Sequence, residues 1–486
     1  METRRGRRTK VSTVDTYDVV VLGGGPTGEN LADRVRAAGL SVVVVEHELV
    51  GGECSYWACM PSKALLRPAA ALADARRVAG SREAVTGPLD ADAVLKRRDA
   101  FAAQWTDDGQ VAWLDSAGIA LVRGHGRLEG VRRVVVQAPD GSENVLVARH
   151  AVAVCTGTRA ALPPLPGIEQ AGVWTSREAT SAGEVPGRLA VVGGGVVAVE
   201  MATAWAALGS RVTLLVRDDT LLDRMEPFAG ELVTEALEAA GVEVRFGVSV
   251  GGVTREPGGE AVLDLGDGEK VTADQVLFAT GRKPATAELG LETVGLTPGS
   301  WIWVDDTGLV VDVPGEWLYA AGDVNRRALL THQGKYQGRI FGQAIADRAA
   351  GRDLDIEDWG RSSATADRLA VPQVVFADPE AASVGLTLAD AQKQGFRVRA
   401  VDYEIGDVAG AELYADGYKG RARAVVDLDR EVLLGVTFVG PGVAELLHSA
   451  TVAVVGEVPI SRLWHAVPAY PTVSEVWLRL LETYRG

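Results

Sequence analysis

Two of the three cysteines in the chain, Cys54 and Cys59, lie within residues 51–63. A helix places positions i and i+5 roughly 140° apart around its axis, so a regular helix cannot join the two sulfurs. We therefore expect Cys54 on an irregular turn and a helix that begins near residues 58–60. Pro61 suits the first turn of that helix, because proline loses no hydrogen bond there. Cys59 would then lie at the positive end of the helix, where a thiolate is stabilised.

The cysteine pair favours a redox-active dithiol, but three other interpretations stay open. A zinc site needs about four ligands, and the sequence has no second cluster of cysteine and histidine. A structural disulfide that closes so short a loop would add little stability, and so few cysteines are typical of a reducing compartment. Two buried, inert thiols are the third alternative. We expect the remaining cysteine, Cys155, to be a core residue, since it lies in an apolar run.

The composition argues against several classes of partner. The formal net charge of −16 disfavours a nucleic-acid or anionic-membrane surface, and no apolar run approaches the roughly 20 residues of a membrane span. Residues 1–15 are basic, but no apolar segment follows before the first expected strand, so we expect a disordered tail on a cytoplasmic protein. The length of 486 residues predicts about two to four domains.

A dinucleotide-binding pattern precedes the cysteines. Residues 18–22 form an apolar run typical of a buried parallel strand, a glycine-rich turn and a helical segment follow, and a second apolar strand ends at Glu46. In the turn, Gly23 permits the tight bend, Gly25 lets a pyrophosphate approach the backbone, and Gly28 lets the helix pack on the sheet. We expect the Glu46 carboxylate to accept from a ribose hydroxyl; a solvated strand end is the alternative.

The same design is repeated 170 residues further along the chain. Gly193 and Gly195 follow a buried strand, and the helix after them leads to a strand at residues 211–216. The acid expected at the end of that strand is missing, and Arg217 comes next. An arginine can pair with a 2′-phosphate that a carboxylate would repel, so this copy favours NADPH, with NADH as the second candidate. A plain surface arginine is the alternative.

Two later segments complete the pattern. An apolar strand ends in Gly322-Asp323, where the acid would bind a sugar hydroxyl if it faces the first nucleotide site; a turn aspartate is the alternative. After Gly351 the pattern changes to an α+β domain of roughly 120 residues. There we expect antiparallel strands at residues 372–376, 422–427 and 432–439 and helices at residues 445–455 and 460–464.

Together these features resemble the class I flavoprotein disulfide reductases, which include dihydrolipoamide dehydrogenase, glutathione reductase and mercuric reductase. The motifs that carry the resemblance are the cysteine pair followed by Met-Pro-Ser-Lys, both glycine loops, Thr-Gly turns at residues 156–157 and 280–281, Ala-Ala-Gly-Asp at 320–323, Asp-Pro-Glu at 378–380 and Tyr-Pro-Thr at 470–472. The resemblance implies an α/β fold with two Rossmann-like dinucleotide-binding domains, for FAD and NAD(P)H, and a C-terminal α+β dimerisation domain. We expect these at residues 16–158 with 285–352, 159–284 and 362–486, respectively.

The resemblance also implies roles for individual residues. Cys59 would face the flavin, and Cys54 would attack the substrate. Asp323 would hold the ribityl chain, and Lys63 with Glu200 would form an ion pair beside flavin N5, where a lysine stabilises negative charge. We further expect glycines near the strand ends to let the cofactors approach the backbone, namely Gly52, Gly157, Gly281 and Gly322.

Several positions depart from the family pattern. Most members carry a histidine where Tyr470 stands, paired with the acid at Glu475, and that histidine protonates the leaving thiolate from the partner subunit. Tyrosine titrates near pH 10, against about 6.5 for histidine, so we expect slower disulfide exchange or an acidic leaving thiol. Glu53 replaces the usual threonine. Tyr56 and Trp57 put bulky rings between the cysteines, where they shape substrate access or merely pack.

We therefore predict an FAD-dependent NAD(P)H:disulfide oxidoreductase, a homodimer whose active site is shared between subunits. Hydride would pass from NADPH to FAD, and electrons then to the Cys54–Cys59 disulfide and on to a small disulfide or another acceptor. The alternative, favoured by the missing histidine, is a reductase of quinones, metal ions or dioxygen that bypasses thiol exchange. A third hypothesis is a non-catalytic nucleotide-binding sensor. Mercuric reductase shares the tyrosine, but this sequence has no terminal cysteine pair and no N-terminal metal-binding module, which argues against metal delivery, and we assign no metal-binding residues.

Overall fold

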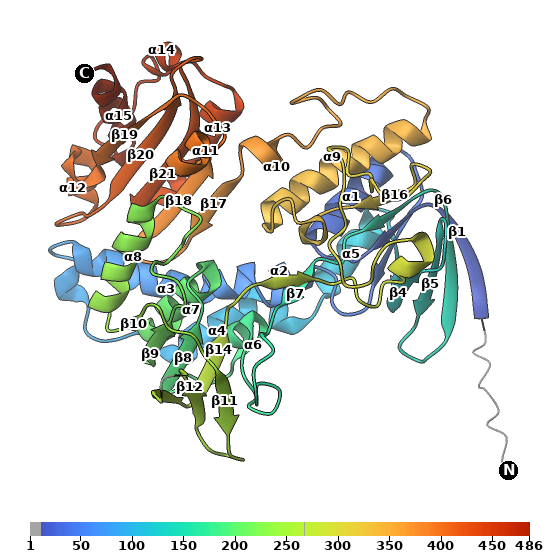
Figure 1. Cartoon of the computed structure of the whole chain (residues 1–486), viewed down its shortest axis with the longest axis horizontal. Coiled ribbons are helices and arrows are strands. Elements are labelled where there is room, and N and C mark those ends of the chain that lie inside the picture. The colour runs from blue at the N-terminus through green and yellow to red at the C-terminus, as the bar shows by residue number, and fades with distance from the viewer. Residues whose placement is uncertain (1–10, 267) are drawn as a thin grey trace. The chain divides into compact units, whose positions relative to one another are not determined.

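The computed structural model describes residues 11–266 and 268–486 (Figure 1). The chain divides into two compact units. The first comprises the described residues up to Tyr56 together with residues 103–159 and 282–368; the second comprises residues 57–102, 160–281 and 369–486. Each unit is therefore assembled from segments that are far apart in the chain. The predicted domain boundaries stay predictions.

A seven-stranded sheet forms the centre of the first unit, in the order β3-β2-β1-β6-β5-β4, with β16 paired to β6. The pairs among β3, β2, β1, β6 and β16 are parallel, whereas β5 and β4 are antiparallel additions. Parallel strands bring their carboxyl ends to one edge, so the turns after β1, β2, β6 and β16 share that edge. The strands are β1 (Val11–Leu22), β2 (Val42–Glu46), β3 (Ala120–Arg123), β4 (His125–Leu128), β5 (Arg133–Gln137), β6 (Glu143–Val154) and β16 (Leu318–Ala320).

Helices cover this sheet because its central strands are apolar on both faces. Val19, Val20 and Val21 of β1 are fully buried, the pattern expected of a parallel strand enclosed on both sides. Helix α1 (Pro26–Ala37) packs beside α9 (Thr331–Ala349), as Figure 1 shows, and α5 (Asp108–Ser116) packs near β3.

The predicted basic tail was too long. Residues 1–10 lie outside the described residues, but residues 11–15 belong to β1. Val14 and Asp15 pair with Val145 and Leu146 of β6, so backbone pairing extends the strand beyond the apolar run that was visible in the sequence.

The second unit repeats the parallel design. Its four-stranded sheet has the order β10-β9-β8-β14, with every pair parallel. A three-stranded antiparallel sheet, β11-β12-β13, accompanies it. The elements are α3 (Cys59–Arg77), α4 (Ala91–Phe101), α6 (Ser176–Ser181), β8 (Arg188–Val192), α7 (Val196–Ala207), β9 (Arg211–Leu215), α8 (Pro227–Ala239), β10 (Glu243–Arg245), β11 (Gly252–Arg255), β12 (Ala261–Asp264), β13 (Lys270–Ala273) and β14 (Gln275–Phe278).

The C-terminal part of this unit is a five-stranded sheet in the order β17-β18-β21-β20-β19, antiparallel throughout. The three strands and the helices expected there are confirmed, whereas β18 and β19 were missed. Strand β18 is rich in small residues, which have low strand propensity and are held by their neighbours on both sides. The elements are β17 (Pro372–Val375), β18 (Glu380–Gly385), α11 (Leu388–Lys393), β19 (Val398–Glu404), α12 (Ala409–Tyr414), β20 (Arg421–Asp427), β21 (Val432–Gly440), α13 (Leu447–Val455), α14 (Ile460–Leu463) and α15 (Val476–Arg485).

Short elements complete the description. A two-stranded ribbon pairs β7 with β15. Two short helices carry Cys54 and Asp367. These elements are α2 (Gly52–Tyr56), β7 (Thr158–Ala160), β15 (Arg282–Pro284) and α10 (Ala366–Leu369).

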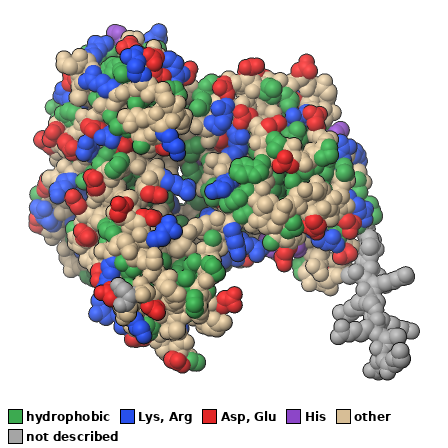
Figure 2. Space-filling view, in the orientation of Figure 1, with side chains coloured by type: hydrophobic (Ala, Val, Ile, Leu, Met, Phe, Trp, Pro, Cys, Tyr) green, Lys and Arg blue, Asp and Glu red, His purple; other side chains and the backbone are tan. Residues whose placement is uncertain are grey.

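The surface mixes charges of both signs. On the face shown in Figure 2, acidic and basic side chains of the described residues are interspersed with apolar ones. Within residues 11–266 and 268–486, no helix combines the length and apolar character that crossing a membrane requires.

A matched pair of phenylalanines in the second unit tests the packing. Phe278 on β14 is 2% exposed, and Phe101 at the end of α4 is 47% exposed. We expect Phe278→Ala to lower the free energy of unfolding by about 3–5 kcal/mol, because it leaves a core cavity. Phe101→Ala should cost less than about 1 kcal/mol. Urea denaturation followed by tryptophan fluorescence measures both, and equal losses would contradict the assigned packing.

Candidate active site

The redox stretch forms two helices with a break between them. Cys54 lies within α2, and Cys59 is the first residue of α3. Ala58 has φ −137° and ψ −99°, which interrupts the helical path. The predicted start of the helix is confirmed, and Pro61 lies in its first turn. The expectation that Cys54 lies on an irregular turn was wrong, because the irregular backbone falls at Ala58. The disulfide pairing itself stays a prediction.

The first glycine loop fits a bound dinucleotide. Gly25 is the N-cap of α1 and supplies no side-chain cap, so the first amide groups of the helix keep their donor capacity. A Cβ atom on Gly25 would meet only Gly52 Cα at 3.9 Å, which leaves the backbone open to a phosphate. A Cβ on Gly28, in contrast, would lie 2.0 Å from the Gly23 carbonyl oxygen. Only glycine at position 28 therefore lets α1 start this close to β1.

Glu46 is held in place by the same loop. Its side chain is buried, Oε2 accepts from the Gly24 N–H at 2.7 Å, and Oε1 accepts from the Glu48 N–H at 2.8 Å. Burial raises the pKa of this carboxyl, but hydrogen bonds from His47, Glu48 and Gly24 outweigh burial and lower it overall. The group is an oriented, ionised acceptor, which is what a ribose hydroxyl requires.

The turn that carries Asp323 lies against the start of α1. A Cβ on Gly322 would come within 2.8 Å of the Thr27 hydroxyl, and Gly322 has φ +80°, which suits glycine. Asp323 Oδ2 accepts from the Thr158 hydroxyl at 2.7 Å. Burial raises the pKa of Asp323, while Thr158 and the nearby guanidinium of Arg282 partly offset that rise. Gly157, at φ +67°, places Thr158 for this contact.

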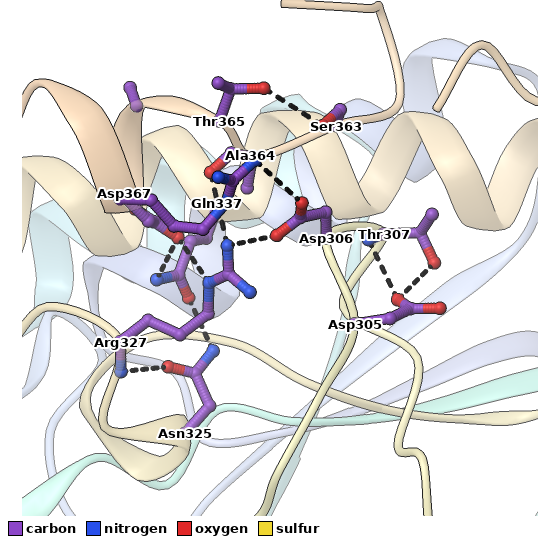
Figure 3. A network of polar contacts seen from close by, with 12 residues as sticks. Asp305, Asp306, Thr307, Asn325, Arg327, Gln337, Ser363, Ala364, Thr365 and Asp367 are labelled. Atoms are coloured by element: carbon purple, nitrogen blue, oxygen red, sulfur yellow. Dashed lines mark hydrogen bonds and ion pairs between the residues drawn. The ribbon is translucent and has the colours of Figure 1, made fainter. Parts of the chain in front are cut away.

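A buried polar network supports this turn and was missed in the sequence (Figure 3). Gln337 on α9 accepts from the Gly322 N–H at 2.7 Å and from Asn325 Nδ2 at 2.8 Å. Its amide nitrogen donates to Asp367 of α10 at 2.9 Å. The same carboxylate accepts from Arg327 at 3.0 Å. The available signal was the pair of glutamines at positions 333 and 337, which lie on one face of a helix; Gln333 also donates to Asp367.

The second glycine loop fits a nucleotide for the same reason. Gly195 is the N-cap of α7 without a side-chain cap, and no atom lies within 4 Å of a Cβ built on it. Gly193, at φ +134°, approaches the Ala279 carbonyl so closely that a Cβ would lie 2.5 Å from the oxygen. Arg217 is 79% exposed, with Nε 3.3 Å from Asp218. Gly281, at φ +135°, accepts from the Ala161 N–H.

Lys63 and Glu200 are brought together in the second unit. Lys63 Nζ lies 2.6 Å from Glu200 Oε2, and Glu200 Oε1 accepts from the Phe376 N–H at 3.0 Å. The ammonium also lies 5.0 Å from the centroid of the Phe376 ring. Lysine keeps partial access to solvent while the carboxylate is almost fully buried, so the pair fixes a positive charge one turn after Cys59.

Trp57, between the cysteines, is anchored by α6. Its carbonyl oxygen accepts from the Thr180 hydroxyl at 2.8 Å, and the Arg177 guanidinium lies 3.8 Å from its ring centroid. The sequence alone left open whether this ring packs or shapes substrate access. It stacks beneath a cation, so it does pack, and no local pattern pointed to Arg177.

Tyr470 and Glu475 occupy different environments. Tyr470 is 76% exposed, whereas Glu475 is 7% exposed. Glu475 Oε2 is buried and has no hydrogen-bond partner among the described residues. A buried acceptor without a donor is costly, so this oxygen is an exception to the usual pairing of buried polar groups.

The network of Figure 3 predicts a pH dependence of stability. Burial raises the pKa of Asp367 to about 6, from 3.8. The native state binds this proton more tightly than the unfolded state does. The resulting contribution to the free energy of unfolding is fully present below about pH 4 and is lost as the pH rises through about 6. The melting temperature of wild type, measured relative to that of Asp367→Asn, should therefore decrease as the pH is raised from 5 to 7.

The exposed Asp358, which pairs with Arg368, provides the control. Asp358→Asn should shift the melting temperature equally at both pH values. A gap between wild type and Asp367→Asn that is constant, or grows with pH, would exclude the assigned titration.

The chain is similar to known proteins over most of its length. The family profile described as pyridine nucleotide-disulphide oxidoreductase matches residues 17–338, and that of its dimerisation domain matches residues 371–480. A mercuric reductase from Shigella flexneri is 33% identical over 479 residues, covering 97% of this chain and 81% of the relative. A dihydrolipoyl dehydrogenase from Thermus scotoductus is 32% identical over 472 residues, covering 95% of each.

A solved structure agrees over the whole fold. The crystal structure of LpdA from Mycobacterium tuberculosis has a TM-score of 0.81 and 25% identity, covering 96% of this chain and 99% of the other. The chain therefore belongs to the pyridine nucleotide-disulphide oxidoreductase family of flavoprotein enzymes, which use FAD and NAD(P)H, and it carries that family's dimerisation domain.

Proposed function

We propose that this enzyme oxidises NADPH through FAD and a Cys54–Cys59 dithiol to reduce a small disulfide or a related acceptor. The observation that carries the proposal is Cys59 at the first position of α3, followed one turn later by the Lys63–Glu200 pair. A thiolate at a helix N-terminus beside a fixed cation is stabilised, and the thiolate is the reactive form.

The residues of the two loops would bind and orient the cofactors. Gly25 and Gly195 open the helix N-termini to pyrophosphate, Glu46 accepts from a ribose hydroxyl, and Asp323 accepts from the ribityl chain. When bound, FAD accepts hydride from the nicotinamide and passes an electron pair to a disulfide. Arg217 is exposed enough to pair with a 2′-phosphate, which supports NADPH over NADH.

The thiol chemistry is a balanced exchange. The Cys54 thiolate attacks one sulfur of the acceptor disulfide, which forms a mixed disulfide and expels the first acceptor thiolate. The Cys59 thiolate then attacks Cys54 Sγ, restores the Cys54–Cys59 bond and expels the second. Each acceptor thiolate takes up one proton. Tyr470 at the usual histidine position would supply protons poorly at neutral pH, so protonation limits the rate.

A second candidate function keeps the flavin chemistry and bypasses thiol exchange. Tyr470 favours it, because a quinone, metal ion or dioxygen needs no thiolate leaving group to be protonated. Within the described ranges, no group of three or more His, Cys, Asp or Glu side chains is placed to hold a metal ion. We propose further that a homodimer brings Tyr470 and Glu475 of one subunit to the cysteines of the other, for which the dimerisation-domain match is the support.

Cysteine variants separate these functions. We expect anaerobic NADPH titration of wild type to consume two electron pairs per subunit, one for the flavin and one for the dithiol, and Cys54→Ser to consume one. Disulfide turnover should be lost in Cys54→Ser and Cys59→Ser. Cys155→Ser is the matched control, because burial raises the pKa of Cys155 to about 12 and keeps this thiol inert.

Unchanged turnover of every acceptor in Cys54→Ser would reject the disulfide mechanism in favour of direct flavin chemistry. Absence of flavin reduction by either nicotinamide would instead support a nucleotide-binding sensor.

Restoring the family histidine tests the proton step. We expect Tyr470→His to raise the rate of disulfide reduction at pH 7 by about tenfold or more, with a pH profile that reports a group near 6.5. Tyr470→Phe should match wild type, since the phenol is a poor shuttle. Stopped-flow reoxidation by a small disulfide measures the step. Loss of turnover in Tyr470→Phe would show that the phenol itself participates.

A further inference from the structure

Glu53, directly before Cys54, forms an ion pair with Arg282 of β15, which is 229 residues further along the chain. Both side chains lie in the first unit and are about one quarter exposed, 29% and 25% respectively. The chain therefore places an acidic side chain directly before its first redox cysteine and a guanidinium against that acid.

The same guanidinium also contacts the turn beside the cofactor site. Arg282 Nε donates to the Thr158 hydroxyl at 2.6 Å, and Nη2 donates to the Thr158 carbonyl oxygen at 2.9 Å. Thr158 in turn donates to Asp323 Oδ2 at 2.7 Å. Nε itself lies 3.9 Å from Asp323 Oδ2. The planar guanidinium of Arg282 therefore bridges two acids: it contacts Glu53 directly and reaches Asp323 through the Thr158 hydroxyl.

The hydroxyl fixes the direction of these hydrogen bonds. A threonine hydroxyl has one proton to donate. Because Arg282 can only donate, Thr158 must accept from Arg282, and its single proton points to Asp323. Asp323 is thereby held as an acceptor, and its other carboxylate oxygen remains for the ribityl hydroxyl.

The cluster formed by Glu53, Arg282 and Asp323 contains two acidic side chains and one basic side chain. Glu53 and Asp323 are acids, and Arg282 is the cation between them. Burial raises the pKa of Asp323, Arg282 opposes the rise, and Glu53 adds to it. Removing the arginine would leave two neighbouring acids beside a site for an anionic dinucleotide. Removing the Glu53 charge would leave Asp323 and Arg282 balanced.

Resting on the proposed function, we propose that Arg282 is a positioning residue that ties the segment carrying Cys54 to the Asp323 turn, with Glu53 as its counter-ion. Arg282 thus serves two purposes. It holds Asp323 as the acceptor of a hydrogen bond from FAD, and it fixes the segment that precedes Cys54, the attacking cysteine. An isolated surface ion pair contributes little, whereas a partly buried arginine that also donates twice to Thr158 is held in one geometry and contributes more.

The test is a double-mutant cycle on the holoenzyme, with the FAD dissociation constant and the long-wavelength thiolate–flavin absorbance of the reduced protein as readouts. We expect Arg282→Gln to weaken FAD binding by about tenfold to 100-fold. Glu53→Gln should retain FAD but lose intensity in the long-wavelength band, because the segment that leads into Cys59, the thiol assigned to face the flavin, is no longer tethered. The double variant should bind FAD more tightly than Arg282→Gln alone, since one negative charge of the cluster has gone.

Two further variants keep the cycle informative. Arg282→Lys keeps the charge without the fork, so it should bind FAD with intermediate affinity even if Arg282→Gln folds poorly. Arg149→Gln, which removes an exposed arginine paired with Asp18 in the same unit, is the matched control and should leave both readouts unchanged.

Additive effects of Glu53→Gln and Arg282→Gln on FAD binding would overturn the proposal, as would an unaltered absorbance band in Glu53→Gln. These outcomes are separable from failure of the proposed function. If Cys54→Ser turns over all acceptors normally, the disulfide mechanism fails, while the coupling between positions 53 and 282 in FAD affinity is still measured independently.

Discussion

The tightest packing constraint in the first unit is the close approach of the start of α1 to the end of β1. Gly28 packs so near the Gly23 carbonyl that a single added methyl group would collide with the oxygen at 2.0 Å. This contact sets where the helix starts, and the rest of the site is built around that point. The uncapped amide groups, the Glu46 carboxylate and the Asp323 turn all lie where the parallel strands end.

Buried polar groups then position the acids at this edge. Glu46 is held by two backbone N–H groups, one from the first glycine loop at Gly24 and one from its own turn at Glu48. Asp323 depends on partners from two other segments: Thr158 donates to its carboxylate, and Gln337 accepts from the Gly322 N–H beside it. Because a buried donor or acceptor without a partner is costly, these side chains are satisfied together. The turn that carries Asp323 is therefore held by the same network that contains Asp367.

The second unit uses the same loop design with different surroundings. Gly195 opens α7 as Gly25 opens α1, but the strand that follows ends in Arg217 instead of an acid. Helix α7 also carries Glu200, whose carboxylate binds Lys63 and the Phe376 amide. One helix thus begins at the second glycine loop and, one turn later, places the Glu200 carboxylate against Lys63.

Helices and strands that depend only on neighbouring residues could be predicted from the local sequence. Both glycine loops, the strands that flank them and the start of α3 at Cys59 follow from residues within a few positions of one another. Small-residue strands such as β18 carried no such signal, and the helical turn around Cys54 was mistaken for irregular chain because the break falls at Ala58. The partners of Glu53, Gln337 and Trp57 were decided only by the tertiary structure. Arg282, Asp367 and Arg177 come from distant segments, and a charged or amide side chain can pair with any complementary group that folding brings within reach.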